Sequence, residues 1–375
     1  WPAFRRRNLA NLSRSKLEAS PDVDVWLDAT LTDITVEAQA VTGVVAKSST
    51  GRELTVRAPN VILAMGAIEN TRQLLLLDRS LDDRLFPEGS RLGAAFHDHL
   101  SAPIADLDSD RPADIVRLFG FRFVPGGMRN LRFELGADAR RRLGLPGAFL
   151  HVAFDRDRRS GFDGLREVYQ SIQRRSLPRL DSLATIASDT PWFARAVWWR
   201  FVEKRVLPPP GARFRIHLVT EQAPDPTNRV ALSDHTLDSF GRPLAVIHWN
   251  IRDRDREAFA SLARLAIDEW RQSPYARMAM PRGVDEATMF AALREGGGIY
   301  HPAGTTPIGP DASTGVVDAD LRVHGLPGLR VLSTSVFPSI GGSSPSLALM
   351  QFAFRMADDL SRGPGPSRES TSGIS

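Results

Sequence analysis

The histidine at position 301 lies in a sequence context that suits proton transfer. It belongs to Tyr300-His-Pro-Ala-Gly-Thr, where a Gly-Thr turn can hold an imidazole at the side of a pocket. The pKa of a neutral imidazole is close to physiological pH, so the ring can take the proton of a hydroxyl group. For an isolated histidine, a side chain that only braces the turn is the more common case. The motif around His301 favours a catalytic base.

Elements of α/β character must position this histidine. Two strand-like segments, 41–46 and 53–56, are separated by a turn with glycine and predict a β-hairpin. The all-apolar run at 61–65 predicts a buried strand, and Gly66-Ala67 leads from it into an apolar helix. A strand, a glycine turn and a helix in this order indicate an α/β layer, with the helix N-terminus available to an anion.

Residues 100–295 show a different pattern. Two helical stretches, at about 163–206 and 253–272, interrupt a series of strand-like segments. These segments lie at 131–134, 148–154, 214–220, 229–232 and 245–249. We therefore expect an antiparallel sheet with helices packed against it.

The composition excludes several kinds of chemistry. Among the 375 residues there is no cysteine, so disulfides, thiolate metal ligands and cysteine nucleophiles are excluded. This leaves the compartment open and favours a reducing cytoplasm. The net charge of +4 is small, and acids alternate with the arginines, so we expect no nucleic-acid partner. No apolar run approaches the roughly 20 residues that a transmembrane helix needs.

Metal and hydrolase sites are not expected either. His97 and His99 are too close in sequence for a site on one helix face, and no HExxH motif accompanies them. The sequence contains no G-x-S-x-G elbow, which is the usual signal of a serine hydrolase.

The order of motifs resembles the glucose–methanol–choline (GMC) oxidoreductases, flavoenzymes that oxidise alcohols. Between residues 298 and 360 the resemblance rests on YHPAGTTPIG, GVVDADLRVHGLPGLRVLSTSVFPS and GGSSPSLALMQFAFRMADDL. The segment GAIENTRQLLLL at 66–77 resembles the second signature of the family. GAAFHDH at 93–99 resembles its Gly-x-Asn-x-x-Asp-His segment, with Ala95 at the usual position of Asn.

This resemblance implies roles for individual residues. His301 would take the hydroxyl proton of an alcohol or sugar while hydride passes to N5 of FAD, in a dehydrogenase or an oxidase. Ser344 stands where the family has His or Asn and would orient the hydroxyl, although its side chain is shorter and carries no charge. The expected cofactor contacts are Gly66, Ala67, Asp98, His99, Ser333 and Pro345. The alternative is a catalytically silent fragment or subunit that acts as a binding module.

The implied fold is mixed, α+β and α/β, with a discontinuous FAD-binding domain. Residues 1–99 and 296–362 would form two parts of this domain, the second with the catalytic loop. Residues 100–295 would form an inserted substrate domain of antiparallel sheet plus helices. The tail at 363–375, rich in Gly, Pro and Ser, is expected to be disordered.

The FAD-binding domain is expected to be incomplete at its N-terminus. The chain opens at Trp1 without an initiator Met, and no G-x-G-x-x-G turn precedes Gly66. In the family this turn belongs to a first βαβ unit, which we expect to lie before Trp1. The parts that are present should still share one core, so the strands at 61–65 and 329–332 should belong to the same layer.

The aromatic stretch at 191–207 has two interpretations. Its Trp and Phe residues alternate with Arg and Lys, a pattern compatible with a helix that lies on a membrane surface. Aromatic residues in such a helix more often pack on their own sheet or close a substrate tunnel, and this second interpretation is the one we expect. The partner that the resemblance implies is a small alcohol or sugar.

Overall fold

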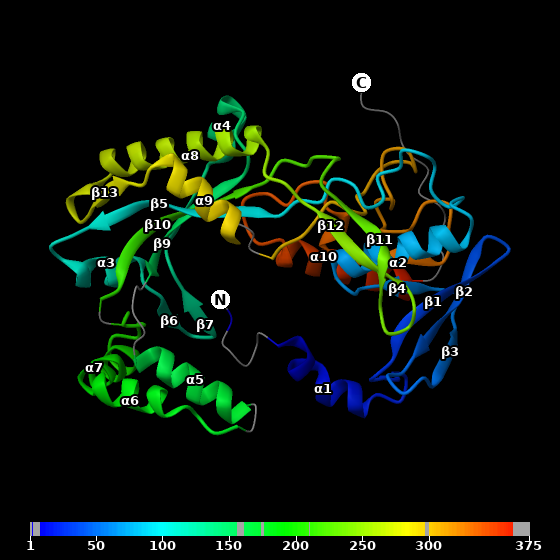
Figure 1. The fold of residues 1–375 in the computed structure, drawn as a ribbon, viewed down its shortest axis with the longest axis horizontal. Coiled ribbons are helices and arrows are strands. Elements are labelled where there is room, and N and C mark those ends of the chain that lie inside the picture. The colour runs from blue at the N-terminus through cyan, green and yellow to red at the C-terminus, as the bar shows by residue number, and fades with distance from the viewer. Residues whose placement is uncertain are drawn as a thin grey trace. The chain divides into compact units, whose positions relative to one another are not determined.

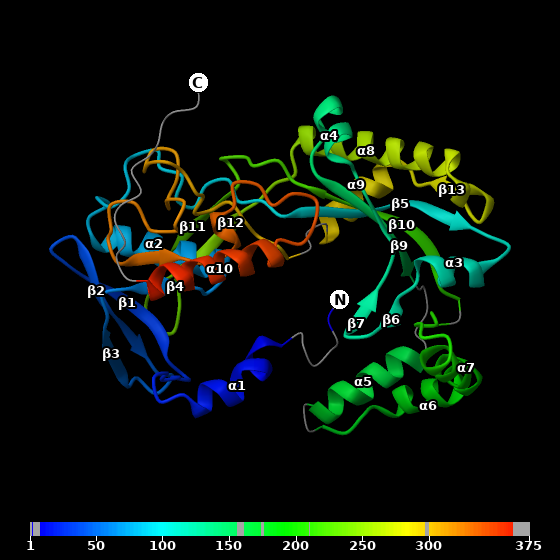
Figure 2. The same cartoon turned by 180° about the vertical axis from the view of Figure 1, so that it is seen from behind.

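Two units share the chain, and each is assembled from three separate stretches of sequence (Figure 1, Figure 2). Unit 1 comprises residues 1–25, 100–220 and 253–297, and unit 2 comprises 26–99, 221–252 and 298–375. The computed structural model describes residues 2, 8–155, 161–173, 176–209, 211–296 and 300–362. The tail that we expected to be disordered lies outside the described residues.

The units differ from the expected domains at two places. Residues 1–25 belong to unit 1, and residues 221–252 belong to unit 2 although they were expected in the inserted domain. The second difference arises because β11 (Arg229–Leu237) and β12 (Pro243–His248) pair with each other and pack on the first helix of unit 2. We expected the strands at 229–232 and 245–249 in the large antiparallel sheet. The structure shows that this was wrong, because they form a separate two-stranded sheet.

Unit 2 contains the predicted hairpin and the predicted shared core. β1 (Thr30–Glu37), β2 (Ala40–Lys47) and β3 (Glu53–Arg57) form a three-stranded antiparallel sheet, in which the β2–β3 pairing confirms the hairpin. β4 (Val61–Leu63) pairs in parallel with β14 (Leu329–Val331), which confirms that these two segments, far apart in the sequence, belong to one core. Every residue of β14 is buried, Arg330 included, whereas in β4 only Leu63 is buried and Ile62 is 42% exposed. The run at 61–65 is therefore not the fully buried strand that we expected.

The predicted helix after β4 is α2 (Ala67–Ser80), and one buried side chain fixes its start. Asn70 accepts a hydrogen bond from the backbone N–H of Met65 at 2.9 Å and donates to the carbonyl of Leu63 at 3.0 Å. Gly66 makes the turn with φ +88°, a conformation that side chains rarely adopt. The end of the strand and the start of the helix are thus held together. The last helix of unit 2 is α10 (Ser346–Ser361).

A five-stranded sheet forms the centre of unit 1. Its strand order is β13-β5-β10-β9-β8, and the pairs β13–β5, β10–β9 and β9–β8 are antiparallel. The bounds are β5 (His99–Asp108), β8 (Arg132–Glu134), β9 (Ala148–Asp155), β10 (Arg213–Glu221) and β13 (Met280–Gly283). β5 escaped the sequence analysis because HLSAPIADLD mixes small and apolar residues without a period of two.

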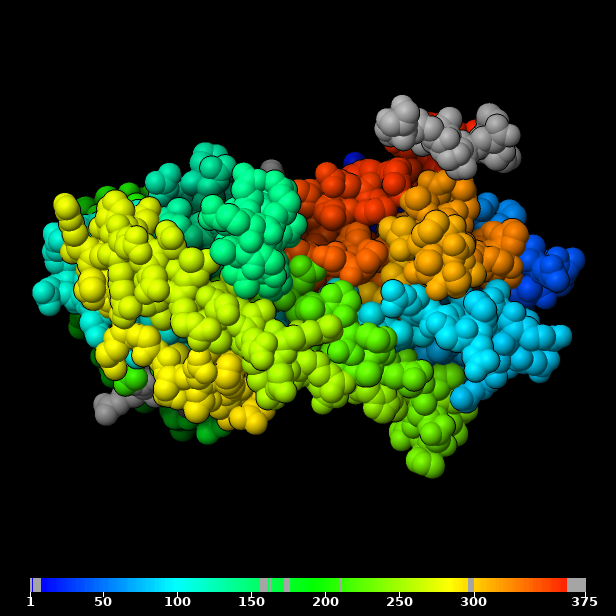
Figure 3. Space-filling view, turned by 90° about the horizontal axis from the view of Figure 1, so that it is seen from above, coloured from blue at the N-terminus to red at the C-terminus, as the bar shows by residue number. Residues whose placement is uncertain are grey.

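Helices complete unit 1. α8 (Asp253–Gln272) has the predicted bounds; it lies along one face of the sheet, and its outer side reaches the surface (Figure 1, Figure 3). The predicted helical stretch at about 163–206 contains three helices, α5, α6 and α7, among the described residues. The other elements are α1 (Leu9–Ala19), α3 (Pro112–Phe119), β6 (Arg122–Val124), β7 (Gly127–Arg129), α4 (Ala137–Leu143), α5 (Gly161–Gln173), α6 (Leu180–Ser188), α7 (Thr190–Phe201) and α9 (Glu286–Gly296).

None of the helices in the described part of the chain combines the length and the apolar character that a membrane span requires.

Candidate active site

Asp98 connects His301 to the segment that precedes β5. Its Oδ1 atom accepts a hydrogen bond from the backbone N–H of His301 at 3.0 Å and another from the backbone N–H of His99 at 2.6 Å. The Asp98 side chain is buried, with 8% of the residue exposed. A buried carboxylate that accepts two backbone N–H groups fixes both histidines at their main chains. The structure therefore brings together three of the predicted site residues.

The imidazoles of His301 and His99 are in contact. Their Nδ1 atoms lie 3.3 Å apart, and the rings meet edge to face with centroids 5.3 Å apart. On the other side of the His99 ring, Nε2 lies 2.8 Å from the carbonyl oxygen of Gly341. A carbonyl oxygen only accepts hydrogen bonds, so Nε2 of His99 carries the proton.

Burial keeps the His99 ring neutral. The residue is fully buried, and the loss of solvation lowers the pKa of His99, with a smaller contribution from the nearby His301. A neutral ring that is protonated at Nε2 has its lone pair at Nδ1, which faces His301. Nδ1 of His301 must then donate, and the lone pair of His301 lies at Nε2. Among the described residues, no side chain or backbone group forms a hydrogen bond with this Nε2 atom.

The loop that supplies the Gly341 carbonyl is held by Glu221 at the end of β10. The Glu221 carboxylate accepts hydrogen bonds from the hydroxyl of Ser339 and from the backbone N–H groups of Ile340, at 2.9 Å, and Gly341, at 3.1 Å. Glu221 was not predicted from the sequence. The only signal was an acidic residue at the end of the apolar strand segment IHLVTE, which is a weak one.

The Gly-Thr turn after His301 packs against a different histidine. Gly304 has φ +87°, and a Cβ atom there would lie 2.4 Å from the carbonyl oxygen of Ala95 and 2.5 Å from the His97 ring. Only glycine fits this position. His97 is fully buried, its Nδ1 lies 2.8 Å from the carbonyl oxygen of Ala95, and burial lowers the pKa of His97. The turn therefore shapes the backbone below His301 rather than holding its ring.

Two predicted residues have other local partners in the structure. The hydroxyl of Ser344 is exposed and lies 3.2 Å from the hydroxyl of Ser346. No hydrogen bond between Ser344 and His301 occurs in the described part of the chain. Ser333 is buried, and its hydroxyl lies 2.5 Å from the hydroxyl of Ser335 and accepts from the backbone N–H of that residue at 3.2 Å.

Backbone groups in unit 2 fit the polar atoms of FAD better than the predicted side chains do. α2 and α10 both begin without a side-chain cap, at Gly66 and Pro345, so the N–H groups of their first turns can bind a polar or anionic group. A Cβ atom at Gly66 would meet nothing within 4 Å, so a ligand can approach this turn. The side chains of Asp98, His99 and Ser333 already have partners inside the protein. We therefore expect the helix starts after Gly66 and Pro345 to hold the cofactor.

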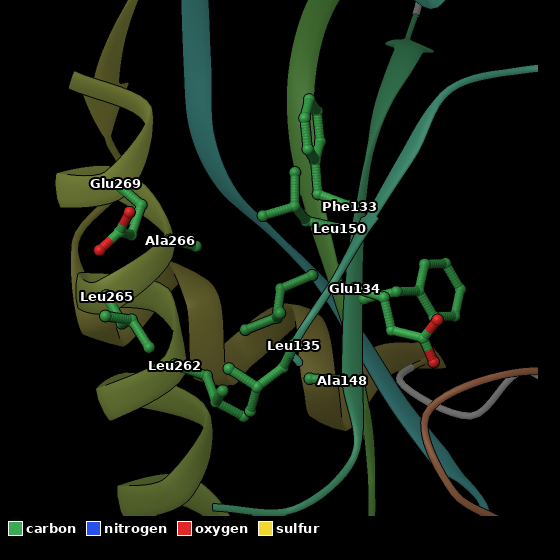
Figure 4. A pocket seen from close by; sticks show the side chains of 11 residues that line it. Phe133, Glu134, Leu135, Ala148, Leu150, Leu262, Leu265, Ala266 and Glu269 are labelled. Carbon is green, nitrogen blue, oxygen red and sulfur yellow. The ribbon is translucent and has the colours of Figure 1, made fainter. Parts of the chain in front are cut away.

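A cavity in unit 1 is lined mainly by apolar side chains and by no histidine. It has a volume of about 240 Å³ and lies between α8 and the strands β8, β9 and β10 (Figure 4). Leu262, Leu265 and Ala266 of α8 line one side, and most of the other lining residues are apolar. Its titratable residues are Glu134 and Glu269, and no histidine lines it. Over the described residues, no group of three or more His, Asp or Glu side chains is arranged to hold a metal ion.

Two family models match the chain. Residues 224–353 match the GMC oxidoreductase model, which includes His301 and the loop after β14. Residues 3–106 match an FAD binding domain model, which includes α2 and the segment with Asp98 and His99. The second match confirms FAD as the predicted cofactor.

Relatives with known sequences give the same assignment. An uncharacterised GMC-type oxidoreductase of Mycobacterium tuberculosis is 27% identical over 352 residues, which cover 90% of this chain and 57% of the relative. The 6'''-hydroxyparomomycin C oxidase of Streptomyces lividus is 34% identical over 143 residues, covering 38% of this chain and 24% of that enzyme. The chain thus spans less than two thirds of the length of these relatives.

Solved structures share the fold. Pyridoxine 4-oxidase from Mesorbium loti superposes with a TM-score of 0.59 at 14% identity, over 95% of this chain and 62% of that protein. Formate oxidase from Aspergillus oryzae superposes with a TM-score of 0.54 at 17% identity, over 92% of this chain and 62% of the oxidase. The match of residues 224–353 to the family model, together with these relatives, confirms the resemblance to the GMC oxidoreductases that the motifs predicted.

Proposed function

We propose that the protein is an FAD-dependent oxidoreductase that acts on the CH–OH group of an alcohol or a sugar, with His301 as the base. The observation that carries this proposal is the contact between His99 and His301, which directs the His301 lone pair to an Nε2 atom without a partner among the described residues. The names of similar proteins support the substrate class. They include a 5-(hydroxymethyl)furfural oxidase and an oxygen-dependent choline dehydrogenase.

In the proposed reaction, His301 takes the substrate proton and His99 fixes the tautomer of His301. The substrate hydroxyl donates its hydrogen bond to Nε2 of His301, and its proton moves to this atom as the carbon loses hydride and becomes a carbonyl. A bound FAD would supply the acceptor for that hydride. His301 then carries a positive charge, and Nδ1 continues to donate to the neutral His99. Because the Gly341 carbonyl holds the His99 proton at Nε2, His301 gains its proton only on the side of the substrate.

Ser344 and the start of α10 complete the proposed site. We assign Ser344 the orientation of the substrate hydroxyl, because its own hydroxyl can donate or accept and is exposed in the loop before α10. The uncapped start of α10 directs backbone N–H groups outward, where they stabilise negative charge on a bound ligand. The observation that favours the alternative, a silent binding module, is that Ser344 and His301 form no hydrogen bond with each other among the described residues.

The decisive experiment is a single-turnover measurement on the intact protein with bound FAD. Anaerobic mixing with a panel of alcohols and sugars should bleach the flavin absorbance. His301→Ala should slow this reduction by about 10²–10⁴-fold, the usual contribution of a positioned base. His248→Ala is the matched control because this histidine is exposed. The flavin in this variant should be reduced at the wild-type rate.

Three results would overturn the proposal or part of it. If His301→Ala binds FAD and reduces it at the wild-type rate, His301 is not the base. If the wild-type protein holds FAD and no CH–OH compound reduces it, the silent binding module is correct. An unchanged rate in Ser344→Ala would remove Ser344 from the site and leave His301 in place.

A further inference from the structure

Helix α7 is fixed to unit 1 by one of its faces. Trp199 is buried, with 8% exposed, and the guanidinium of Arg117 lies 5.8 Å from its ring centre. Trp192 donates from Nε1 to the carbonyl oxygen of Pro208 at 2.9 Å, and its ring meets Phe193 with centroids 4.8 Å apart. These aromatic residues are the packing face of α7, so the helix has its place in the unit without help from its other side.

The opposite side of α7 is also apolar, and it is exposed. Val197, Trp198 and Phe201 are 57%, 58% and 63% exposed, and Val202 after the helix is 54% exposed. Positions 194, 198 and 201 follow the helical spacing of four and three, so Ala194 belongs to the same stripe. A helix that is apolar on all sides is normally buried on all sides. Within the described residues, half of α7 lacks such an apolar environment.

Basic residues accompany this stripe. Between residues 190 and 206 there are three arginines and one lysine but only one acidic residue, Glu203. Arg195 and Lys204 are exposed, and no acidic partner of either side chain occurs among the described residues. Arg200 lies over the ring of Phe123, 3.6 Å from its centre, and so points to the body of the unit. The exposed stripe is thus flanked by positive charge and contains no negative charge.

We propose that α7 and the turn through Val206 bind the surface of an anionic lipid bilayer. Trp198 and Phe201 would enter the boundary between headgroups and acyl chains, and Arg195 and Lys204 would contact lipid phosphates. An apolar stripe with tryptophan, flanked by unpaired basic residues, is typical of helices that lie in the interface, and the charge is complementary to anionic headgroups. The helix has 12 residues and is too short to span a bilayer.

Vesicle binding by the intact protein tests this proposal. The protein should co-sediment with vesicles of phosphatidylglycerol and phosphatidylcholine, bind pure phosphatidylcholine more weakly, and release as salt is raised. The double variant Trp198→Ser/Phe201→Ser should lower partitioning about ten-fold or more, because it removes two large apolar side chains from the interface. Arg195→Glu should lower binding to the anionic vesicles about five-fold or more, since each basic residue near such a surface contributes about 1 kcal/mol.

Matched variants elsewhere in unit 1 separate this effect from a general loss of apolar surface or charge. Met280→Ser on β13 removes an apolar side chain that is 53% exposed, and Arg142→Glu on α4 reverses an exposed charge. Both should bind vesicles like the wild type.

Two outcomes would overturn the proposal. One is a wild-type protein that fails to bind anionic vesicles, or that binds them equally well after the α7 substitutions. The other is a stripe that serves a second copy of the chain. In that case the Trp198→Ser/Phe201→Ser variant would change the elution volume in size-exclusion chromatography and leave vesicle binding unchanged.

Discussion

Each unit of the protein contains a pair of neighbouring histidines, and the two pairs differ in the group that forms a hydrogen bond with one of their rings. In unit 2, His99 and His301 have ring centroids 5.3 Å apart, and Nε2 of His99 forms a hydrogen bond with the carbonyl of Gly341. In unit 1, His151 and His217 face each other across β9 and β10 with centroids 5.7 Å apart. There, Nε2 of His217 lies 3.3 Å from the carboxylate of Asp155.

The nearby carboxylate takes a different partner in each pair. Asp98 bonds only backbone N–H groups of His99 and His301, so their rings are left to bond each other. In unit 1, Asp155 accepts from the His217 ring, and that hydrogen bond is the main cause that lowers the pKa of Asp155.

The ring nitrogen that has no hydrogen-bond partner among the described residues also differs between the pairs. In unit 1 it is Nδ1 of His151, which is buried and has no hydrogen-bond partner among the described residues. Burial, with smaller electrostatic contributions from His217 and Arg132, lowers the pKa of His151 to about 4. In unit 2 it is Nε2 of His301, which can receive a substrate proton. The placement of the partners, and not the residue type, therefore separates a candidate base from a structural pair that is sensitive to acid.

We expect the largest effect, on the rate of flavin reduction, from removing the hydrogen bonds that join His301, His99 and Gly341 in unit 2. His99→Phe removes the acceptor for Nδ1 of His301 and frees the ring to adopt the other tautomer, so flavin reduction should slow by about 10²-fold. His99→Asn should retain more activity, because an amide can accept from His301 and donate to Gly341. Single-turnover rates across pH check this. If His99 had only a structural role, the pH profile of the remaining activity would be unchanged in both variants.

The pair in unit 1 should make folding sensitive to acid. The folded-state pKa of His151 is about 4 and the unfolded value is about 6.5, so below pH 6.5 the unfolded chain binds more protons and stability falls as pH falls. Between pH 7 and pH 5 the loss from this residue should reach about 2 kcal/mol. It should stop growing below about pH 4, where both states are protonated.

His151→Phe tests this pH dependence, because it replaces the titrating ring by an apolar one of similar shape. Urea midpoints at pH 7 and pH 5 should lie closer together in this variant than in the wild type. His248→Phe is the control, since this histidine is exposed and the difference between its two midpoints should match that of the wild type. Equal pH dependence in all three proteins would show that His151 is not responsible.

The turn below the unit 2 pair should tolerate little change. Gly304→Ala places a Cβ atom against Ala95 and His97 at φ +87°, so we expect a loss of about 2–3 kcal/mol in stability. Gly66→Ala has a similar φ, +88°, but no neighbour within 4 Å, so it reports the backbone strain alone. Thermal unfolding of both variants separates the contact from the strain. An equal shift in Tm would exclude the contact.

The smallest effect concerns Ala95, which has φ +57° although it is not glycine. Ala95→Gly should relieve this strain and stabilise the protein by about 0.5 kcal/mol after the entropy cost of glycine. Ala94→Gly, one residue earlier and without a positive φ, should be destabilising. Paired Tm measurements check the sign. A loss of stability in both variants would show that Ala95 is not strained.

Local patterns in the sequence predicted several elements of both units. The all-apolar run of β4 and the glycine turn before α2 have a definite local signature, and so does the amphipathic period of α8. β5 lacks one because its small residues hide the period of two. The hairpin of β11 and β12 was recognised as strands but assigned to the wrong unit, since a strand pattern shows a buried face and not the partner that buries it.

The sequence by itself determined that His301 is a candidate base, that its motif belongs to the GMC oxidoreductases, and that FAD is the cofactor. It also placed Asp98 and His99 at the site, as contacts of the cofactor. Only the tertiary structure showed that these two residues also contact His301, across 203 and 202 positions of sequence. It likewise brought Glu221 to the loop of Gly341, 120 positions away. Such contacts have no local period to reveal them, because the burial of whole strands and helices decides which distant side chains meet.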